Sequence, residues 1–194
     1  MVVTQAAIDA LFLNARTANG FVSTAVDEEL LVKAYEIASM GPTSMNTQPA
    51  RFVFLRTTEQ KERLIPALLP GNVDKTRSAP VTAIVANDTR FYEHLSKTWH
   101  VPDAGKMFES NEALALATAA RNATLTGGYF ILACRALGLD CGPMSGFDPS
   151  KVNQEFFPDG RFQVNFLLNL GYADKSKEFA RNPRLSFQQA CQLL

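Results

Sequence analysis

The first helical signal in the chain is a stripe of apolar residues near its N-terminus. Apolar residues spaced at i, i+3, i+4 and i+7 are typical of the buried face of an α-helix. Ile8, Leu11, Phe12 and Ala15 have this spacing. We therefore predict a helix over residues 5–15, which places Arg16 at the junction between that helix and a loop.

A second helix is predicted from its start and stop signals. Asp27 stands at the N-cap, and Val26 and Leu31 have the spacing of a hydrophobic staple. Apolar residues continue at helical spacing up to Ile37. The Gly41-Pro42 pair then ends the helix, because proline cannot continue it.

The rest of the chain alternates strand-like and helix-like patterns. Apolar and β-branched runs predict strands over residues 52–56, 80–86 and 161–171. Residues 111–137 are rich in Ala and Leu and close with Gly138, which predicts one helix of about 25 residues and about 38 Å. Capping-box patterns predict two shorter helices, after Thr57 and after Ser186. Alternating elements of this kind favour an α/β or α+β class.

Length and charge limit the possible classes of function. With 194 residues the chain fits a single domain, 1–194, that is large enough to bury a core. Lys+Arg 19 balances Asp+Glu 19, so no nucleic-acid or membrane partner is predicted. The most apolar stretch, residues 129–141, is interrupted by Arg135 and Asp140, and we predict no signal peptide and no membrane span.

The cysteines and histidines favour a reduced protein without a metal. Cys134, Cys141 and Cys191 are odd in number and lack metal-type spacing, which fits structural thiols in a cytoplasmic protein. His94 and His100 are six residues apart and no metal motif accompanies them, so no metal site is predicted.

One polar block stands out between two prolines, Pro42 and Pro49. It holds four short side chains that donate and accept hydrogen bonds, Thr43, Ser44, Asn46 and Gln48. The prolines restrict the backbone of the block and of the residues that precede them. These residues alone leave two interpretations open, an ordinary polar loop and a rigid polar clamp for a ligand.

This block resembles the flavin-binding motif of the nitroreductase family, which consists of FMN-dependent NAD(P)H oxidoreductases. Three further segments resemble the family's motifs: Arg16-Thr17-Ala18-Asn19-Gly20-Phe21, Gly142-Pro143-Met144-Ser145-Gly146-Phe147 and Arg184-Leu185. Within the family, Ala50-Arg51-Phe52, residues 142–147 and residues 180–187 are most similar to the malonic semialdehyde reductases of pyrimidine degradation.

The resemblance implies an α+β nitroreductase fold. In that fold a central mixed β-sheet is flanked by helices on both faces, and two chains form an intertwined homodimer with FMN at the subunit interface. Gly127-Gly128 in the long helix costs about 1 kcal/mol per glycine relative to alanine. We therefore interpret this pair as a site of close packing in the dimer.

The resemblance also implies which side chains bind the FMN phosphate. By motif position these are Arg16 and Arg184, each of which can donate two parallel hydrogen bonds to phosphate oxygens. Arg181 and Lys177 are weaker candidates for the same charge. For a single arginine, the alternative is an ordinary surface ion pair.

Thr17 and Asn19 are expected to continue the contact from the phosphate toward the flavin ring. The family usually has Arg or Lys where this chain has Asn19, so negative charge on the reduced ring is stabilised less. Lys75 is the candidate for supplying that charge, and Asn72 is a candidate for a contact with the ring.

The remaining implied flavin contacts come from two walls and the long helix. One wall is formed by Pro143, Met144, Ser145 and Gly146. Its backbone amides are expected to approach the ring closely because glycine has no side chain. Without the resemblance, such a sequence would usually be interpreted as a turn. Asn122 is implied on the long helix. The other wall is the clamp, which reaches the flavin held mainly by the other chain and consists of Pro42, Thr43, Ser44 and Asn46.

Residues 90–110 form the segment expected above the flavin. Its aromatic residues, interleaved with His and Lys, predict either a lid that selects the substrate or a covering loop with buried anchors. These residues are Phe91, Tyr92, Trp99, His100 and Phe108.

The favoured function is a homodimeric enzyme that binds FMN, oxidises NADH or NADPH and reduces malonic semialdehyde to 3-hydroxypropionate. No dinucleotide fingerprint occurs in the chain, so nicotinamide and substrate are expected to use one face of the flavin in turn. FMN carries the hydride, and no side chain is assigned to that step. The alternatives are a nitroaromatic or quinone reductase of broad specificity and a non-catalytic flavin-binding module, which Asn19 favours.

Overall fold

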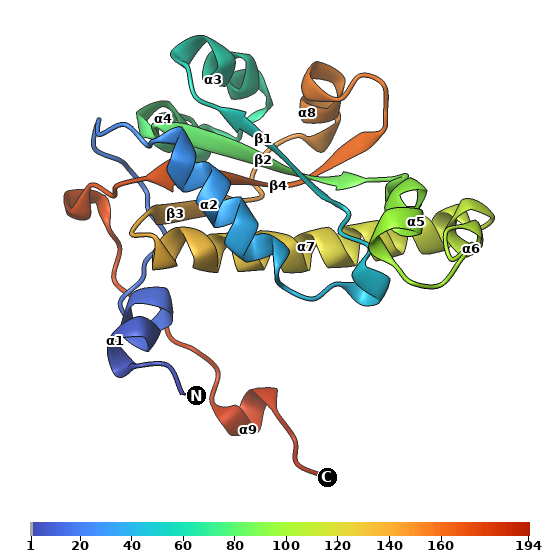
Figure 1. Ribbon diagram of the computed structural model, residues 1–194. Helices are drawn as coiled ribbons and strands as arrows, with labels where there is room; N and C mark the ends of the chain where they lie inside the picture. The colour runs from blue at the N-terminus through green and yellow to red at the C-terminus, as the bar shows by residue number, and fades with distance from the viewer. Residues whose placement is uncertain (1) are drawn as a thin grey trace.

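The computed structural model describes residues 2–194, and a four-stranded antiparallel sheet lies at its centre (Figure 1). The strand order is β1-β2-β4-β3. The strands are β1 (Ala50–Leu55), β2 (Val81–Asp88), β3 (Asp140–Met144) and β4 (Phe162–Gly171).

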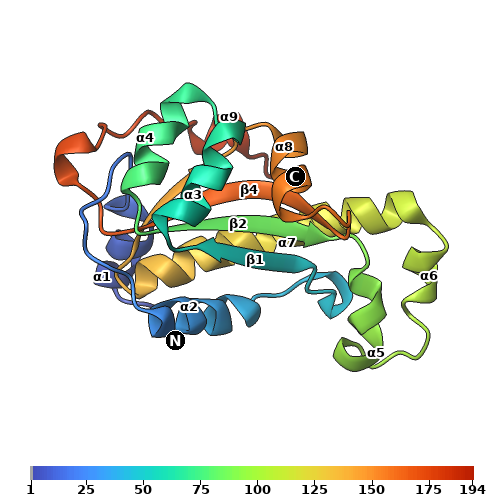
Figure 2. The same cartoon turned by 90° about the horizontal axis from the view of Figure 1, so that it is seen from above.

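Helices cover both faces of this sheet (Figures 1 and 2). One face carries α2 (Glu28–Ser39) and α7 (Glu112–Ala136). The opposite face carries α3 (Thr58–Leu64), α4 (Pro70–Ser78) and α8 (Pro149–Phe156). The predicted α+β class, with helices on both faces of a central sheet, is therefore confirmed. Within residues 2–194 the strands pair only in antiparallel fashion, and the parallel element of the expected mixed sheet is limited to an isolated bridge between Thr17 and Cys141.

The core has one apolar cluster on each face of the sheet. Strand β2 supplies both, because successive side chains of a strand point to opposite faces. Val81 and Ala83 pack in the cluster under α2 and α7, whereas Ile84 and Ala86 pack in the cluster under α3 and α8. The apolar run predicted as a strand over residues 80–86 therefore forms β2, a strand buried on both faces of the sheet, as predicted.

Gly127 allows α7 to lie close to the sheet. A β-carbon at this position would lie 2.5 Å from the ring of Phe166 on β4, so the glycine makes room for that side chain. A β-carbon at Gly128 would meet no atom within 4 Å. The prediction that both glycines serve the dimer is therefore wrong for Gly127, which packs within its own chain.

The first and last helices lie at one end of the molecule (Figure 1). The predicted N-terminal helix consists of α1 (Gln5–Ile8) followed by a π-helical turn (Asp9–Leu13). The C-terminal α9 (Phe187–Ala190) is short and starts at the predicted Ser186 capping box. The capping box at Thr57 is also present.

Helix α2 starts directly after Asp27, as predicted, but the Asp27 side chain makes no capping hydrogen bond. Val26 and Leu31 belong to one buried cluster, in agreement with the predicted staple. Cys134 and Cys141 are buried, whereas Cys191 is exposed, so the structural role predicted for all three thiols does not hold for Cys191. A hydrogen bond with Cys141, together with burial, raises the pKa of the Cys134 thiol above its ordinary value.

Residues 90–110 form a lobe of short helices at the other end of the sheet (Figure 2). The helices are a 3₁₀ turn (Phe91–His94), α5 (Leu95–Thr98) and α6 (Lys106–Glu109). Phe91 and Phe108 are buried in a separate small cluster and anchor the lobe to the start of α7. None of the helices in residues 2–194 is long and apolar enough to cross a membrane.

Candidate functional site

Predicted site residues from the two ends of the chain meet in a pocket of about 630 Å³, here called the arginine pocket. It lies between the N-terminal helical segment and residues 179–184, beside the end of α7. Its polar side chains are Arg16, Thr17, Asn19, Arg135, Arg181, Asn182 and Arg184. Five predicted FMN residues, from positions more than 160 apart in sequence, therefore share one cavity.

Backbone carbonyls hold two of these arginines in place. Arg16 Nη1 donates to the carbonyl oxygens of Leu13, Asn14 and Ala15 at 3.0–3.2 Å. Arg181 Nη2 donates to those of Phe12, Leu13 and Ala15 at 2.7–2.9 Å. The carbonyl end of a helical segment attracts cations. These carbonyl groups therefore hold the guanidinium groups of Arg16 and Arg181 on the pocket wall in the absence of a ligand.

The arginine pocket contains no side chain that would neutralise its charge. No Asp or Glu lines it, and none of its four arginines forms an ion pair with any residue from 2 to 194. Loss of hydration, and then repulsion by Arg16, Arg184 and Arg135, lowers the pKa of Arg181 from its ordinary value. Unpaired guanidinium groups of this kind are what a phosphate requires. Lys177 differs, because its Nζ lies 3.9 Å from Asp174 Oδ2.

Sequence reasoning overlooked one member of this group, Arg135. It comes from the last turn of α7, and its Nη1 donates to the Leu11 carbonyl oxygen at 2.9 Å. The sequence signal that could have identified it is a cation inside the apolar run of residues 129–141. From the sequence alone, this cation served only as an argument against a membrane span.

The segment after Arg16 leads directly to the predicted flavin wall. Ala18 N donates to the Cys141 carbonyl oxygen at 3.0 Å, which fixes the segment against the edge strand β3. A β-carbon on Gly142 would lie 2.7 Å from the Ala18 carbonyl oxygen, so this close approach requires glycine. Asn19 Nδ2 bonds the Thr17 carbonyl oxygen at 3.1 Å.

The wall itself is more regular than a loop. Pro143 and Met144 belong to β3, where proline is tolerated because the strand lies at the sheet edge. Only Ser145 and Gly146 follow it as a loop. Asn72 Nδ2, from α4, donates to the Gly146 carbonyl oxygen at 2.7 Å and positions that loop.

Lys75 also comes from α4 and forms no ion pair within residues 2–194. Partial burial lowers the pKa of its ammonium group. An anionic ligand would favour the charged form of this group. This position is therefore consistent with its predicted role next to a ring that gains negative charge.

The clamp has a strained backbone. Met45, Asn46 and Gln48 have positive φ angles of 50°, 50° and 42°, which residues other than glycine rarely adopt. Such strain persists only where surrounding contacts impose it, and it is concentrated at functional sites. The clamp therefore has a defined backbone, and its role in binding a ligand stays a prediction.

Two side chains of α7 hold the clamp. Asn122 is buried, and its Oδ1 accepts the Ser44 backbone N–H at 2.8 Å while its Nδ2 donates to the Thr118 carbonyl oxygen at 2.9 Å. The Tyr129 hydroxyl donates to the Pro42 carbonyl oxygen at 3.1 Å. In this chain Asn122 supports the clamp, and its predicted contact with flavin stays a prediction.

The clamp is also tied to the lobe of residues 90–110. Asn46 Nδ2 donates to the Thr98 carbonyl oxygen at 2.8 Å, and Asn46 Oδ1 accepts from Gln48 Nε2 at 2.9 Å. Thr43 Oγ1 accepts the Gln48 backbone N–H at 3.2 Å. The predicted flavin residues of the clamp therefore lie next to the segment that was expected to select the substrate.

Within one chain, the clamp and the arginine pocket are far apart. Asn122 supports the clamp and Arg135 lines the pocket, and both are on α7. Their separation of 13 residues corresponds to about 20 Å of helix at 1.5 Å per residue. The clamp and the arginine pocket of one chain therefore do not meet in a single cavity.

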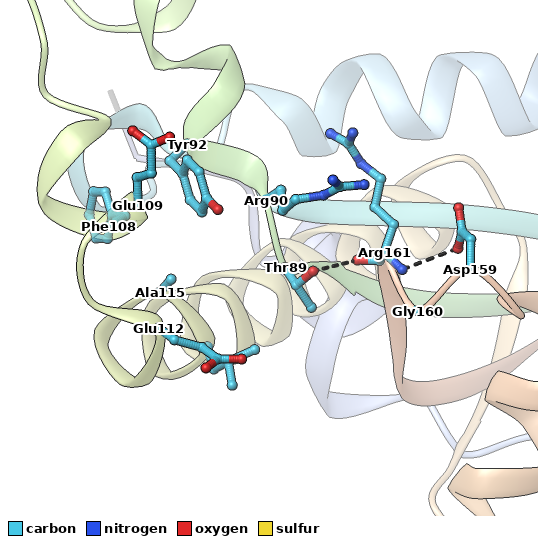
Figure 3. Close-up of a pocket in the computed structure, with 11 residues that line it drawn as sticks. Thr89, Arg90, Tyr92, Phe108, Glu109, Glu112, Ala115, Asp159, Gly160 and Arg161 are labelled. Atoms are coloured by element: carbon cyan, nitrogen blue, oxygen red, sulfur yellow. Dashed lines mark hydrogen bonds between the residues drawn. The ribbon is translucent and has the colours of Figure 1, made fainter.

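A second pocket, of about 500 Å³, contains none of the predicted flavin residues (Figure 3). Glu109 and Glu112 reach it from α6 and the start of α7, and Asp159 and Arg161 from the turn before β4 (Figure 3). Both arginines here have acidic partners: Arg161 pairs with the fully buried Asp88 at 3.3 Å and with Glu93 at 2.9 Å, and Arg90 pairs with Glu93 at 3.7 Å. This pocket thus differs from the arginine pocket.

No group of three or more His, Cys, Asp or Glu side chains in residues 2–194 is arranged to hold a metal ion.

Comparisons with known proteins agree on one family. Residues 14–172 match the sequence profile described as the Nitroreductase family. A protein of Ralstonia nicotianae, provisionally named NADH dehydrogenase/NAD(P)H nitroreductase, is 51% identical over 187 residues, or 96% of each chain. A protein of Cupriavidus pinatubonensis with the same provisional name is 52% identical over 193 residues, or 98% of each chain.

Solved structures share the fold at low sequence identity. The ydfN protein of Bacillus subtilis, provisionally named a nitroreductase, has a TM-score of 0.87 at 23% identity, covering 98% of this chain and 100% of its own. A protein of Exiguobacterium sibiricum, provisionally named a nitroreductase and crystallised with FMN, has a TM-score of 0.86 at 19% identity, covering 100% and 99%.

Proposed function

Because the chain belongs to the nitroreductase family, we propose that it is an FMN-dependent NAD(P)H oxidoreductase. The observation that carries this proposal is the arginine pocket, in which unpaired guanidinium groups adjoin the segment that leads to β3 and its wall. FMN has a phosphate at one end and a polar ring at the other. The arginine pocket is suited to the phosphate, and the wall with its supporting amides is suited to the ring.

The side chains have separate tasks in this proposal. Arg16, Arg181 and Arg184 hold the phosphate, and Thr17 and Asn19 lead from it toward the ring. The wall that covers the ring consists of Pro143, Met144, Ser145 and Gly146, with Asn72 holding Gly146 in place. Lys75 supplies positive charge near the ring edge. FMN, when bound, accepts a hydride from the nicotinamide and passes it to the acceptor.

We further propose that each complete site needs two chains. The clamp residues Pro42, Thr43, Ser44 and Asn46 would close the site formed by the arginine pocket of a second copy. Separation of the clamp from the arginine pocket of the same chain by about 20 Å along α7 supports this arrangement. Exposed apolar side chains support it as well, among them Leu125 on α7 and Phe179 in the C-terminal segment, which are 44% and 74% exposed.

The acceptor is proposed to be a nitroaromatic compound, in line with the names of the relatives reported above, or a quinone. Malonic semialdehyde is the second candidate, and it is supported by the resemblance of residues 50–52, 142–147 and 180–187 to reductases of that aldehyde. The structure gives Arg51 another partner, because its Nη2 lies 2.7 Å from Asp88 Oδ2. We therefore do not assign Arg51 to a substrate carboxylate.

The test begins with the purified full-length protein. It is expected to bind about one FMN per chain and to oxidise NADH or NADPH with a nitroaromatic, a quinone or malonic semialdehyde as acceptor. Initial-rate plots are expected to give parallel lines, because the chain contains no second nucleotide fingerprint. Protein that cannot be reconstituted with FMN would overturn the proposal. A kcat/KM for malonic semialdehyde above that for the other acceptors and for an uncharged short aldehyde would favour the second candidate.

A further inference from the structure

Arg135 is the member of the arginine pocket that no motif of the chain includes, and it comes from a different element than the others. Arg16 belongs to the N-terminal segment, and Arg181 and Arg184 belong to the C-terminal segment. Arg135 extends from the last turn of α7. Figure 1 shows this end of α7 next to α1, in agreement with the bond from Arg135 Nη1 to the Leu11 carbonyl oxygen at 2.9 Å.

An alternative role for Arg135 is to cap the helical segment that ends at Leu13. Capping is already provided by other side chains, however. Arg16 and Arg181 both donate to the carbonyl oxygens of Leu13 and Ala15, so two of these carbonyl groups have two arginine donors each. Arg135 satisfies the Leu11 carbonyl oxygen as well, but that bond uses only Nη1 of its guanidinium group, and a fourth guanidinium group in the pocket adds repulsion between like charges.

The hydrogen bonds of Arg135 leave donors free for a ligand. Its guanidinium group has five N–H donors, and its one side-chain hydrogen bond within residues 2–194 uses Nη1. No carboxylate in that range lies within 4.0 Å of it. The group is half-buried and lines the pocket. Four cations in one cavity without an acidic residue repel one another, and a bound anion would relieve that repulsion.

We infer that Arg135 is a direct ligand of the phosphate group in the arginine pocket and completes a four-arginine site for a phosphomonoester dianion. This inference rests on the proposed function for the identity of the ligand, FMN. A phosphomonoester carries about −1.5 to −2 charges at pH 7. The bond to Leu11 fixes the Arg135 side chain, so that α7 and the N-terminal segment are both linked to the bound phosphate.

The experiment compares FMN with riboflavin, which has the same ring but no phosphate. Dissociation constants are measured by flavin fluorescence for the full-length wild type, Arg135→Gln, Arg135→Lys and Arg63→Gln. Arg63 is an exposed arginine on α3, on the opposite face of the sheet, and provides the matched control. The melting temperature of each flavin-free protein is measured with and without inorganic phosphate.

Arg135→Gln is expected to weaken FMN binding about 10-fold, the effect of one charge-assisted bond, and to leave riboflavin binding within about twofold. It should also reduce the rise in melting temperature caused by inorganic phosphate. Arg135→Lys retains the charge and should lose less affinity for FMN than Arg135→Gln. Arg63→Gln should bind both flavins like the wild type. Equal losses for FMN and riboflavin, or unchanged binding of both, would overturn the inference.

The phosphate measurement separates this inference from the proposed function. If inorganic phosphate stabilises the wild type through Arg135 while neither flavin binds, the anion site stands and the flavin function fails. If FMN binds much more tightly than riboflavin and Arg135→Gln preserves that ratio, the flavin function stands and the role of Arg135 is refuted.

Discussion

Asn122 allows a direct test of how the clamp is held. Replacement by alanine removes an oxygen that accepts the Ser44 N–H at 2.8 Å and a nitrogen that donates to the Thr118 carbonyl oxygen at 2.9 Å. Asn122 is only 2% exposed. The bond to Ser44 N is partly buried, and the bond to the Thr118 carbonyl oxygen is buried, so water can replace the lost partners only in part.

The expected magnitude follows from that burial. Leaving buried or partly buried polar groups without a partner costs about 1–3 kcal/mol. In a domain of this size, each kcal/mol shifts the melting temperature by about 2–4 °C. Asn122→Ala should thus melt about 2–12 °C lower than wild type, and it should also bind FMN more weakly. The second effect arises because the strained backbone at Met45, Asn46 and Gln48 loses one of its restraints.

A matched control exists in α8. Asn153 Oδ1 accepts the Val164 N–H at 2.8 Å, the same kind of bond at the same distance, but far from the clamp in sequence and fold. Asn153→Ala should destabilise the protein without changing its affinity for FMN. Urea unfolding and flavin titration are measured on both variants.

Two outcomes would refute this reasoning. If Asn122→Ala unfolds like wild type, the Ser44–Asn122 bond does not stabilise the clamp. If both variants lose FMN affinity equally, the loss reports general destabilisation and not the position of the clamp.

Two further predictions concern Lys75 and the shared site. Burial lowers the pKa of Lys75, so the folded protein binds the proton of this side chain less tightly than the unfolded chain does. The free energy of unfolding without FMN should therefore rise as pH increases through that lowered pKa toward 10.5. Lys75→Met should reduce this rise in urea titrations at several pH values and weaken FMN binding, while Lys61, whose pKa burial also lowers, supplies the remainder of the rise; an unchanged pH dependence would contradict the assignment. Mixing Arg16→Ala chains with Asn46→Ala chains should restore FMN binding at one site in each mixed dimer, whereas no recovery over either parent would exclude a site shared between chains.

Elements with a strong local signal could be predicted from the sequence. The Ala-rich run ending at Gly138 forms α7, and the pattern at Thr57 forms a capping box. Both depend on residues within a few positions of each other. Helices α4 and α8 have no comparable stripe of apolar residues, because they are short and half-exposed, and they were not predicted.

Contacts between residues far apart in sequence could not be predicted in the same way. Gly127 serves Phe166, a side chain 39 positions later, and neither residue carries a local signal of that contact. Arg135 reaches Leu11 across 124 positions. Its significance depends on the other arginines in the cavity and on the lack of acidic residues among them. Motif resemblance identified the residues with family counterparts and missed this one.

The contacts of Asn46 connect flavin binding with the choice of acceptor. Its amide bonds Thr98 and Gln48 at the same time, so a shift of the clamp would disturb the contact with the lobe of residues 90–110. That lobe is anchored at its base by Phe91 and Phe108. Buried anchors, one of the two alternatives for this segment, are therefore present, and selection of the substrate by this lobe stays a prediction. In a shared site, the chain that contributes the clamp would also contribute this lobe. Acceptor preference would then depend on the partner of the chain that holds the phosphate.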